Sequence, residues 1–230
     1  MKKINEIQYR GYCFGTRAGL SEHHYRQLTD LFEHASGPEP SILGGRAAIM
    51  ETVLDSIGDV VIKTYQRGGL IRFLIRETYL NLGTTRCQAE YEQMNHAYQL
   101  GIHVPKPVAY AFKGGLFYKG WLITEKIHHQ KTLADLSRTD LPKAQAASVK
   151  LAEQISRLMD HHIFHQDLHP GNVLVTEEGK VFIIDFDKAG RVSGTRQQLA
   201  SRYLKRWKRA VTKYQLPDVL SRTLENGLLS

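Results

Sequence analysis

The chain has 230 residues, 42% of them hydrophobic and 23% charged, which is enough for one domain or two small lobes with a substantial core. Its formal net charge of +8 favours an anionic partner, and no apolar run approaches the roughly 20 residues of a membrane-spanning helix. The first residues lack the apolar core of a signal peptide, and two cysteines without metal-binding spacing exclude a disulfide framework, so we expect a cytosolic or peripheral membrane protein.

The first predicted helix covers residues 21–32, where a serine can cap the helix and apolar side chains recur on one face. A stretch containing proline and glycine, residues 36–40, ends it. Residues 41–50 are then typical of a strand, a glycine turn and a second strand. At this turn Gly44 and Gly45 could let backbone N–H groups approach a phosphate, or could form a plain hairpin turn.

A further strand is predicted over residues 59–65, where three β-branched apolar residues precede Lys63. A lysine in a strand usually lies on the solvent-facing side. Here the apolar neighbours and the glycine turn upstream favour a lysine that binds phosphate groups.

The next helix is predicted over residues 84–101, with Gly101 as its C-terminal cap. Two glutamates on this helix, Glu90 and Glu92, could hold the strand lysine by an ion pair. They point about 200° apart around the helix axis, so only one of them can do so. We choose Glu90, because apolar side chains one and two turns later can pack beside it, and we expect Glu92 to be solvated.

Two strands are expected next, at residues 108–112 and 120–125, around a glycine-containing turn. They lead into a connector at residues 125–127. Its backbone groups, at Glu125 and Ile127, would be offered to an adenine base, so its side chains need no special character.

Helices follow at residues 133–136 and 144–160. The second carries an apolar stripe, which is core far more often than it is a cofactor site.

The most informative pattern is an aspartate, an asparagine five residues later and a second aspartate thirteen residues beyond that: Asp167, Asn172 and Asp185. Between them, residues 173–175 and 181–184 are short β-branched runs around a glycine-containing turn, which predicts a β-hairpin. The polar residues therefore lie at the outer ends of two paired strands, where one site can collect them.

Phosphoryl transfer from ATP needs this combination of groups. A hydroxyl nucleophile needs a carboxylate to orient it and take its proton, and the triphosphate needs Mg²⁺ held by hard oxygen ligands. We assign the first role to Asp167 and the second to Asn172 and Asp185, with His165 and His169 supporting the loop. The alternative is a solvated loop followed by a strand that ends in acidic residues.

The pattern matches the kinase catalytic loop His-Arg-Asp-x-x-x-x-Asn and the Asp-Phe-Gly that follows it, with Gln166 in place of the arginine and Asp187 in place of the glycine. Asp187 removes a flexible hinge and offers a further metal contact. Lys63 then matches the lysine of the kinase strand Val-Ala-Ile-Lys, which pairs with the α- and β-phosphates, and Glu90 matches its helix partner.

The end of the chain is strongly basic, because eight Lys or Arg residues and no acidic residue lie between Arg191 and Lys213. Apolar residues within residues 199–214 recur at helical spacing. Such a helix could lie on an acidic membrane or face an anionic ligand, or it could pack its Tyr and Trp face inside the protein. The two interpretations have equal weight.

These segments together resemble the lipopolysaccharide kinases, and within that family the kinases of 3-deoxy-D-manno-octulosonic acid (Kdo). The resemblance covers roughly residues 41–215. It is carried by Lys63, the Arg-Gly-Gly-Leu run at residues 67–70, the Val-Pro-Lys-Pro connector at residues 104–107 and the loop of Asp167.

The resemblance implies an α+β, protein-kinase-like fold with two lobes. The implied antiparallel-sheet N-lobe covers about residues 1–124, the hinge about residues 125–127 and the mainly helical C-lobe about residues 128–230. It also implies ATP- and Mg²⁺-dependent phosphorylation of a sugar hydroxyl on Kdo–lipid A, in the biosynthesis of the lipopolysaccharide inner core. The implied partners are ATP, an anionic glycolipid acceptor and the cytoplasmic face of a bacterial inner membrane, contacted by the basic C-terminal region; no nucleic acid is expected.

Other functions remain open. A heptose kinase of the lipopolysaccharide core, or an aminoglycoside- or choline-like phosphotransferase, would use the same chemistry. A non-catalytic pseudokinase would not need Lys63, Asp167, Asn172 and Asp185 together. Nucleic-acid binding is suggested only by the basic C-terminal region.

Overall fold

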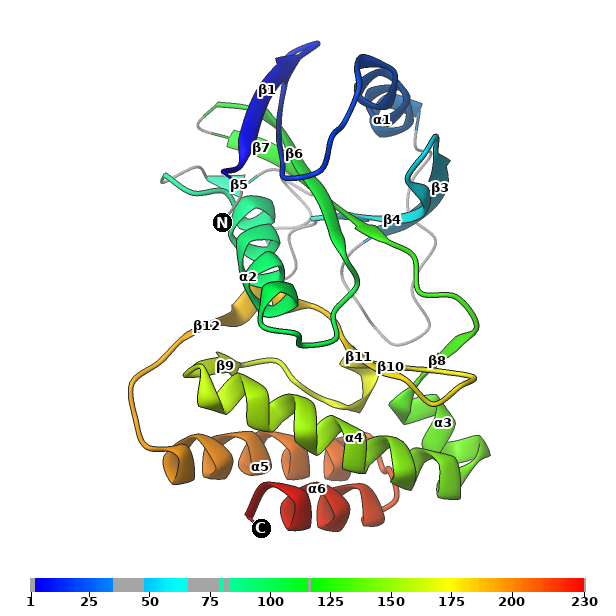
Figure 1. Cartoon of the computed structure of the whole chain (residues 1–230), viewed down its shortest axis with the longest axis vertical. Coiled ribbons are helices and arrows are strands. Elements are labelled where there is room, and N and C mark those ends of the chain that lie inside the picture. Colours follow the sequence, from blue (N-terminus) through cyan, green and yellow to red (C-terminus); the bar gives the residue numbers. More distant parts are fainter. Residues whose placement is uncertain (1–2, 35–47, 66–78, 81–82, 116, 230) are drawn as a thin grey trace. The chain divides into compact units, whose positions relative to one another are not determined.

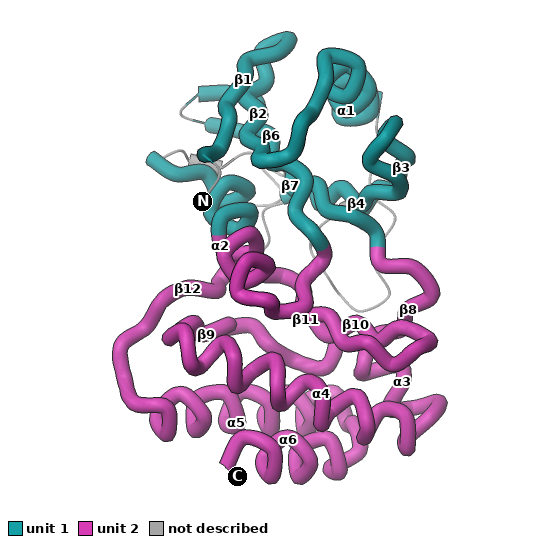
Figure 2. Tube along the Cα trace, in the orientation of Figure 1, with its two compact units in different colours: residues 1–92, 106–126 teal, residues 93–105, 127–230 magenta. Residues whose placement is uncertain are grey.

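The computed structural model describes residues 3–34, 48–65, 79–80, 83–115 and 117–229 (Figure 1). The chain divides into two compact units (Figure 2). The first unit consists of residues 1–92 and 106–126, and the second of residues 93–105 and 127–230. The division after residue 126 lies in the expected connector, whereas residues 93–105, expected in the first lobe, belong to the second unit.

The first unit contains an antiparallel sheet with the strand order β1-β2-β6-β7-β4-β3, in which β5 pairs with β7. Its strands and first helix are β1 (Asn5–Tyr9), β2 (Tyr12–Thr16), α1 (Glu22–His34), β3 (Ala48–Leu54), β4 (Gly58–Thr64), β5 (Tyr79–Leu80), β6 (Pro107–Gly114) and β7 (Phe117–Glu125). The helix predicted at residues 21–32 is α1, and the strands predicted at residues 59–65, 108–112 and 120–125 are β4, β6 and β7. These predictions are confirmed.

The core of the first unit is aromatic. Phe32 of α1 stacks on Trp121 of β7 with ring centroids 4.4 Å apart, so α1 packs on the sheet. Gly15 of β2 lies opposite Tyr110 of β6, and a Cβ atom at Gly15 would come within 2.0 Å of the Tyr110 ring. A side chain at this position would have to displace the buried Tyr110 ring, so glycine makes room for that ring.

Helix α2 (Arg86–Gln99) matches the helix predicted over residues 84–101. Gly101 ends it in a left-handed conformation, at a φ of 72°, which is the predicted capping role. The residues after the helix are fixed in the second unit by His103, whose N–H donates to Gln154 Oε1 at 2.8 Å and whose carbonyl accepts from Ile183 at 2.9 Å. These bonds explain why residues 93–105 belong to the second unit.

The second unit is mainly helical and carries two small antiparallel sheets, with the orders β11-β10-β8 and β12-β9. Its elements are β8 (Gln130–Thr132), α3 (Leu133–Thr139), α4 (Leu141–Asp160), β9 (Ile163–His165), η2 (Pro170–Asn172), β10 (Val173–Thr176), β11 (Val181–Ile183), η3 (Phe186–Lys188), β12 (Ala189–Arg191), α5 (Arg196–Lys213) and α6 (Val219–Leu229). Strands β10 and β11 form the predicted hairpin, in which Val173 lies opposite Ile183. The helices predicted at residues 133–136 and 144–160 are α3 and α4.

Helix α5 shows the inward packing of the basic C-terminal region that the second interpretation expects. Its apolar residues are buried, and Trp207, only 1% exposed, donates from Nε1 to the carbonyl of Leu220 in α6 at 3.3 Å. The Tyr and Trp face therefore packs inside the second unit, which leaves lysines and arginines outside. No helix in the described ranges combines the length and the apolar character needed to cross a membrane.

Candidate active site

The first unit contains one half of the expected set of residues. Lys63 Nζ on β4 lies 3.0 Å from Glu90 Oε1 and 2.8 Å from Glu90 Oε2 on α2. The Glu90 side chain is 1% exposed and that of Lys63 is 23% exposed. A carboxylate buried this deeply needs a cation beside it, so the pair fixes the position of the lysine. Glu92 instead accepts a hydrogen bond from Gln88 Nε2 at 3.2 Å.

Tyr65 is a member of this cluster that the sequence did not predict. Its hydroxyl donates to Glu90 Oε2, and its ring lies 5.2 Å from Lys63 Nζ and 5.7 Å from Arg86 Cζ. Since Tyr65 follows Lys63 by two residues, the alternation of side chains along a strand could have placed both on one face. Glu90 is thus held by a tyrosine as well as by the lysine.

The expected nucleotide-binding residues are only partly described. The connector is tied to the first unit, because Glu125 N–H donates to the Lys106 carbonyl at 2.9 Å and Lys126 N–H donates to the Asp59 carbonyl at 2.9 Å. The Glu125 N–H is therefore already hydrogen-bonded within the first unit. Its carbonyl is the backbone group of Glu125 that we consider for adenine binding. Ile127 lies in the second unit and is partly buried. The predicted phosphate turn, at residues 44–45, lies outside the described residues.

The second unit holds the other half, in the loop between β9 and β10. Asn172 Nδ2 donates to the backbone carbonyl of Asp167 at 3.0 Å, and Asn172 N–H donates to the His169 carbonyl at 2.8 Å. Gly171 N–H in turn donates to His169 Nδ1 at 3.1 Å. These bonds close the loop on itself and set Asp167 and Asn172 in a fixed relation.

Asp185 joins this loop through the hairpin. The N–H of Ile184 donates to the Asn172 carbonyl at 3.0 Å, which brings the start of β10 beside the residue that precedes Asp185. Asp185 itself has a φ of 65° and a ψ of 63°, a left-handed conformation that is uncommon outside glycine. Strained residues of this kind are frequent at active sites and ligand-binding loops.

The two histidines of the loop differ in their environment. His165 is fully buried, its Nε2 lies 3.1 Å from the Ile184 carbonyl, and its ring lies 4.8 Å from that of Phe186. Burial lowers the pKa of His165 and favours its neutral ring, which packs against Phe186 and bonds to the Ile184 carbonyl. His169 is partly buried, and its ring centroid lies 5.7 Å from that of Tyr214. Burial lowers the pKa of His169, although the nearby charge of Asp167 acts to raise it. Asp187 is partly buried within η3.

Arg206 of α5 is a second residue that the sequence did not predict. Its Nη2 donates to Asp167 Oδ1, and the two side chains are 35% and 32% exposed. The arginine comes from a helix far along the chain, so no local pattern indicates this contact. It makes Arg206 the cation beside the expected base.

Asn172 and Asp185 offer an amide oxygen and a carboxylate, which are hard ligands of the type that Mg²⁺ prefers. Within the described residues, no group of three or more His, Cys, Asp or Glu side chains is placed to hold a metal. A two-residue set fits Mg²⁺, because this ion usually takes one or two protein ligands together with phosphates and water.

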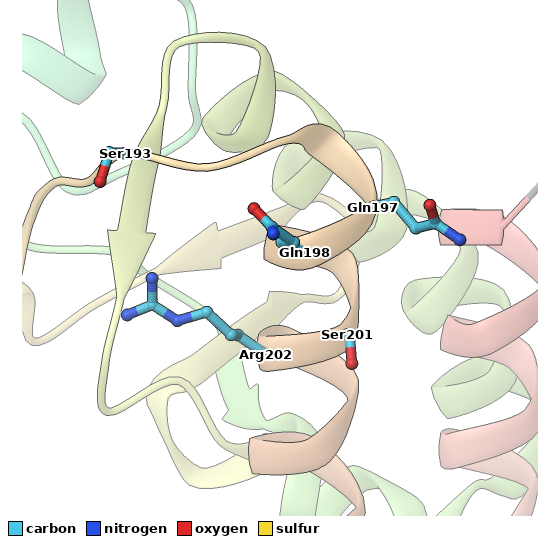
Figure 3. A pocket seen from close by; sticks show the side chains of 5 residues that line it. All are labelled: Ser193, Gln197, Gln198, Ser201 and Arg202. Atoms are coloured by element: carbon cyan, nitrogen blue, oxygen red, sulfur yellow. The ribbon is translucent and has the colours of Figure 1, made fainter.

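A polar pocket lies at the start of α5 (Figure 3). It is lined by Ser193, Gln197, Gln198, Ser201 and Arg202. It contains no carboxylate, so it lacks the groups of the catalytic loop.

A strand lysine paired with a helix glutamate, a loop carrying Asp167 and Asn172, and a hairpin ending at Asp185 define a protein-kinase-like phosphotransferase of α+β fold. Comparison with known proteins gives the particular family. The model of the lipopolysaccharide kinase (Kdo/WaaP) family matches residues 44–222, and the chain belongs to this family, as its motifs predict.

Curated relatives are named 3-deoxy-D-manno-octulosonic acid kinase in several bacteria. The protein of Vibrio parahaemolyticus serotype O3:K6 is 30% identical over 177 residues, which is 75% of this chain and 74% of the relative. That of Vibrio cholerae serotype O1 is 34% identical over 130 residues, 55% of each chain. That of Haemophilus influenzae (strain PittGG) is 36% identical over 142 residues, 58% of each chain, so these two matches span little more than half of the relatives' length.

Proposed function

We propose that this protein transfers the γ-phosphoryl group of ATP to a hydroxyl of Kdo on a lipid A precursor, a step in the biosynthesis of the lipopolysaccharide inner core. The observation that carries the choice of acceptor is the shared name of relatives at 30% to 36% identity in three bacteria. The arrangement of Asp167, Asn172 and Asp185 supports the chemistry independently of that name.

In this proposal Asp167 orients the acceptor hydroxyl and takes its proton as the oxygen attacks the γ-phosphorus; the bond from that phosphorus to the bridging oxygen breaks and ADP leaves. Asn172 and Asp185 would hold Mg²⁺, which would neutralise phosphate charge. His165, buried beneath the loop, keeps the Asp167 segment and Ile184 together. His169 supports the loop through its bond from Gly171, and Asp187 lies close enough in sequence to Asp185 to add a metal contact.

The first unit supplies the proposed nucleotide-binding residues except Ile127, which lies in the second unit. Lys63, fixed by Glu90 and Tyr65, pairs with the α- and β-phosphates of ATP. The adenine base donates a hydrogen bond to the Glu125 carbonyl and bonds to the backbone of Ile127.

We also propose a peripheral position on the cytoplasmic face of the inner membrane. Arg202, Lys205, Arg209 and Lys213 are exposed and fall within about 80° around α5, and we call them the cationic face of α5. Because the apolar residues of α5 are buried, attraction to anionic lipid would be electrostatic and would weaken as salt is added. Salt-dependent binding to vesicles containing anionic lipid, lost when these four residues are changed to glutamine, tests this position.

The acceptor assay tests the main proposal. The protein is incubated with γ-labelled ATP, Mg²⁺ and one of three acceptors: Kdo–lipid IVA, a heptosylated core acceptor or a small amino alcohol. We expect label on Kdo–lipid IVA alone. Label confined to the heptosylated acceptor would show a heptose kinase, and label confined to the amino alcohol would show a small-molecule phosphotransferase; either result rejects the proposal.

A further inference from the structure

The contact between Arg206 and Asp167 suggests a role beyond the binding of ATP. Arg206 Nη2 donates to Asp167 Oδ1, and both side chains are about one-third exposed, at 35% and 32%. An ion pair with this exposure is weak, because water screens it and competes for both partners. A ligand that reaches the catalytic aspartate can therefore also reach the arginine and replace its partner.

The protein leaves the guanidinium of Arg206 incompletely bonded. A guanidinium has five N–H donors, and within the described part of the chain the hydrogen bond of Arg206 goes to Asp167. Its Nε is buried and has no partner there. Arginine is the side chain best suited to a carboxylate or a phosphate, which it can bind through two parallel hydrogen bonds.

The surroundings of Arg206 also favour an anion. Helix α5 carries no acidic residue, and the cationic face lies next to Arg206 around the helix. One turn before it, Arg202 is already engaged, with its Cζ 4.0 Å from the centre of the Phe164 ring. Lys208, on another side of α5, is paired with Glu225 at 2.7 Å. Arg206 is thus the cation of α5 that is in contact with the catalytic loop.

We propose that Arg206 binds the carboxylate of the acceptor sugar, next to the hydroxyl that is phosphorylated. The inference rests on the proposed function, in which the acceptor is an octulosonic acid and so carries a carboxylate. When the acceptor binds, Arg206 exchanges Asp167 for this carboxylate, and Asp167 Oδ1 becomes available to the acceptor hydroxyl. A sugar without the acid group leaves Arg206 on Asp167 and is rejected, because a site built for a polar group discriminates strongly against its absence.

Two acceptors that differ only in this group provide the test: Kdo–lipid IVA and the same compound with the Kdo carboxylate converted to its methyl ester. KM and kcat for both are measured with the wild-type protein and with the R206Q, R206K and K208Q variants. For the wild type we expect KM for the ester to be at least tenfold higher. R206Q should raise KM for the acid about tenfold, which corresponds to about 1.4 kcal/mol, and leave KM for the ester nearly unchanged.

The other variants separate charge from folding. K208Q removes one positive charge from the same helix and should keep the preference of the wild type for the acid. R206K keeps the charge at 206 and should recover part of that preference, so it also serves if R206Q does not fold.

The proposal is overturned if R206Q retains the preference for the acid, or if its kcat falls equally on both acceptors with KM unchanged, since Arg206 would then only position Asp167. Failure of the wild type to phosphorylate Kdo–lipid IVA rejects the proposed function itself. These results are distinct, because the first requires an active wild-type enzyme.

Discussion

The Lys63–Glu90 pair of the first unit and the Arg206–Asp167 pair of the second join the same kinds of groups in different environments. Glu90 is 1% exposed, and both of its oxygens accept from Lys63. Asp167 is 32% exposed and accepts from Arg206 through one oxygen. A buried carboxylate cannot release its cation without a large penalty, whereas an exposed one can exchange partners. The first pair therefore suits a permanent positioning role, and the second suits a group that must meet a substrate.

Removal of the exposed carboxylate should have the largest effect on activity and little effect on stability. We expect D167N to lower kcat for the acceptor reaction by about 10²- to 10⁴-fold, the usual contribution of a general base. Asp160 provides a matched control, because it is also an exposed aspartate paired with an arginine, Arg196. D160N should retain wild-type kcat in the same assay. A D167N protein with near-normal turnover would show that Asp167 is not the base.

Removal of the buried carboxylate should instead affect stability as well as activity. E90Q leaves Lys63 with a neutral partner, and we expect a loss on the order of 2 kcal/mol in the free energy of unfolding. This is below the roughly 3–5 kcal/mol of a fully buried pair, because Lys63 stays 23% exposed. KM for ATP should rise together with this loss. Urea unfolding and ATP titration measure the two effects.

Glu92 supplies the control for E90Q on the same helix. Its carboxylate accepts from Gln88 and does not bind Lys63 in the described structure. E92Q should change the free energy of unfolding by no more than about 0.5 kcal/mol, because the amide oxygen of glutamine can still accept from Gln88. If E92Q and E90Q behaved alike, burial would not distinguish the two glutamates.

The tyrosine that shares Glu90 should contribute less than the lysine. Y65F removes a hydroxyl that donates to a buried carboxylate, and the loss should be about 1.5 kcal/mol in the free energy of unfolding. Y98F is the control, since Tyr98 lies on α2 and is 46% exposed. An unchanged stability of Y65F, measured by urea unfolding, would show that the Tyr65 hydroxyl does not help to hold Glu90.

Local patterns predicted much of the fold and of this site. The hairpin β10–β11 follows from two β-branched runs around a turn, and the fixed spacing of Asp167, Asn172 and Asp185 then places them at its ends. Helical periodicity puts apolar neighbours beside Glu90 and so favours it over Glu92, and Glu90 is buried in the structure. In each case the informative pattern is close in sequence to the residue that it predicts, within a few helical turns or one hairpin.

Other features depend on contacts between distant segments. Arg206 meets Asp167 only because α5 packs its Trp207 face inside the second unit. Residues 93–105 join that unit through the bonds of His103. The hairpin β1–β2 does carry a local signal. Arg10 and Gly11 at its turn both have positive φ values, and glycine adopts such values readily. Helix α6 likewise places Leu220, Leu224 and Leu228 at helical spacing.

The smallest expected effect per residue is the loss of stability of the two units at acidic pH. His96, His103, His165 and His169 all have a pKa lowered by burial, and all four lie in the second unit. In the unfolded chain these histidines take up protons near their ordinary pKa of about 6.5, while the folded state resists protonation. The stability they contribute is therefore complete above about pH 6.5 and is lost as the pH falls below it.

Hydrogen exchange at pH 7.5 and pH 6.0, corrected for the intrinsic exchange rate, compares the units directly. For His165, which is fully buried, the loss of stability at pH 6.0 is at most about 0.8 kcal/mol. This corresponds to at most about a fourfold fall in protection. Protection should fall more in α4 and α5 than in β4 and β7. The H165N variant should show a smaller difference between the two pH values than H161N, because His161 is exposed. Equal losses in both units would mean that the buried histidines of the second unit do not set its sensitivity to acid.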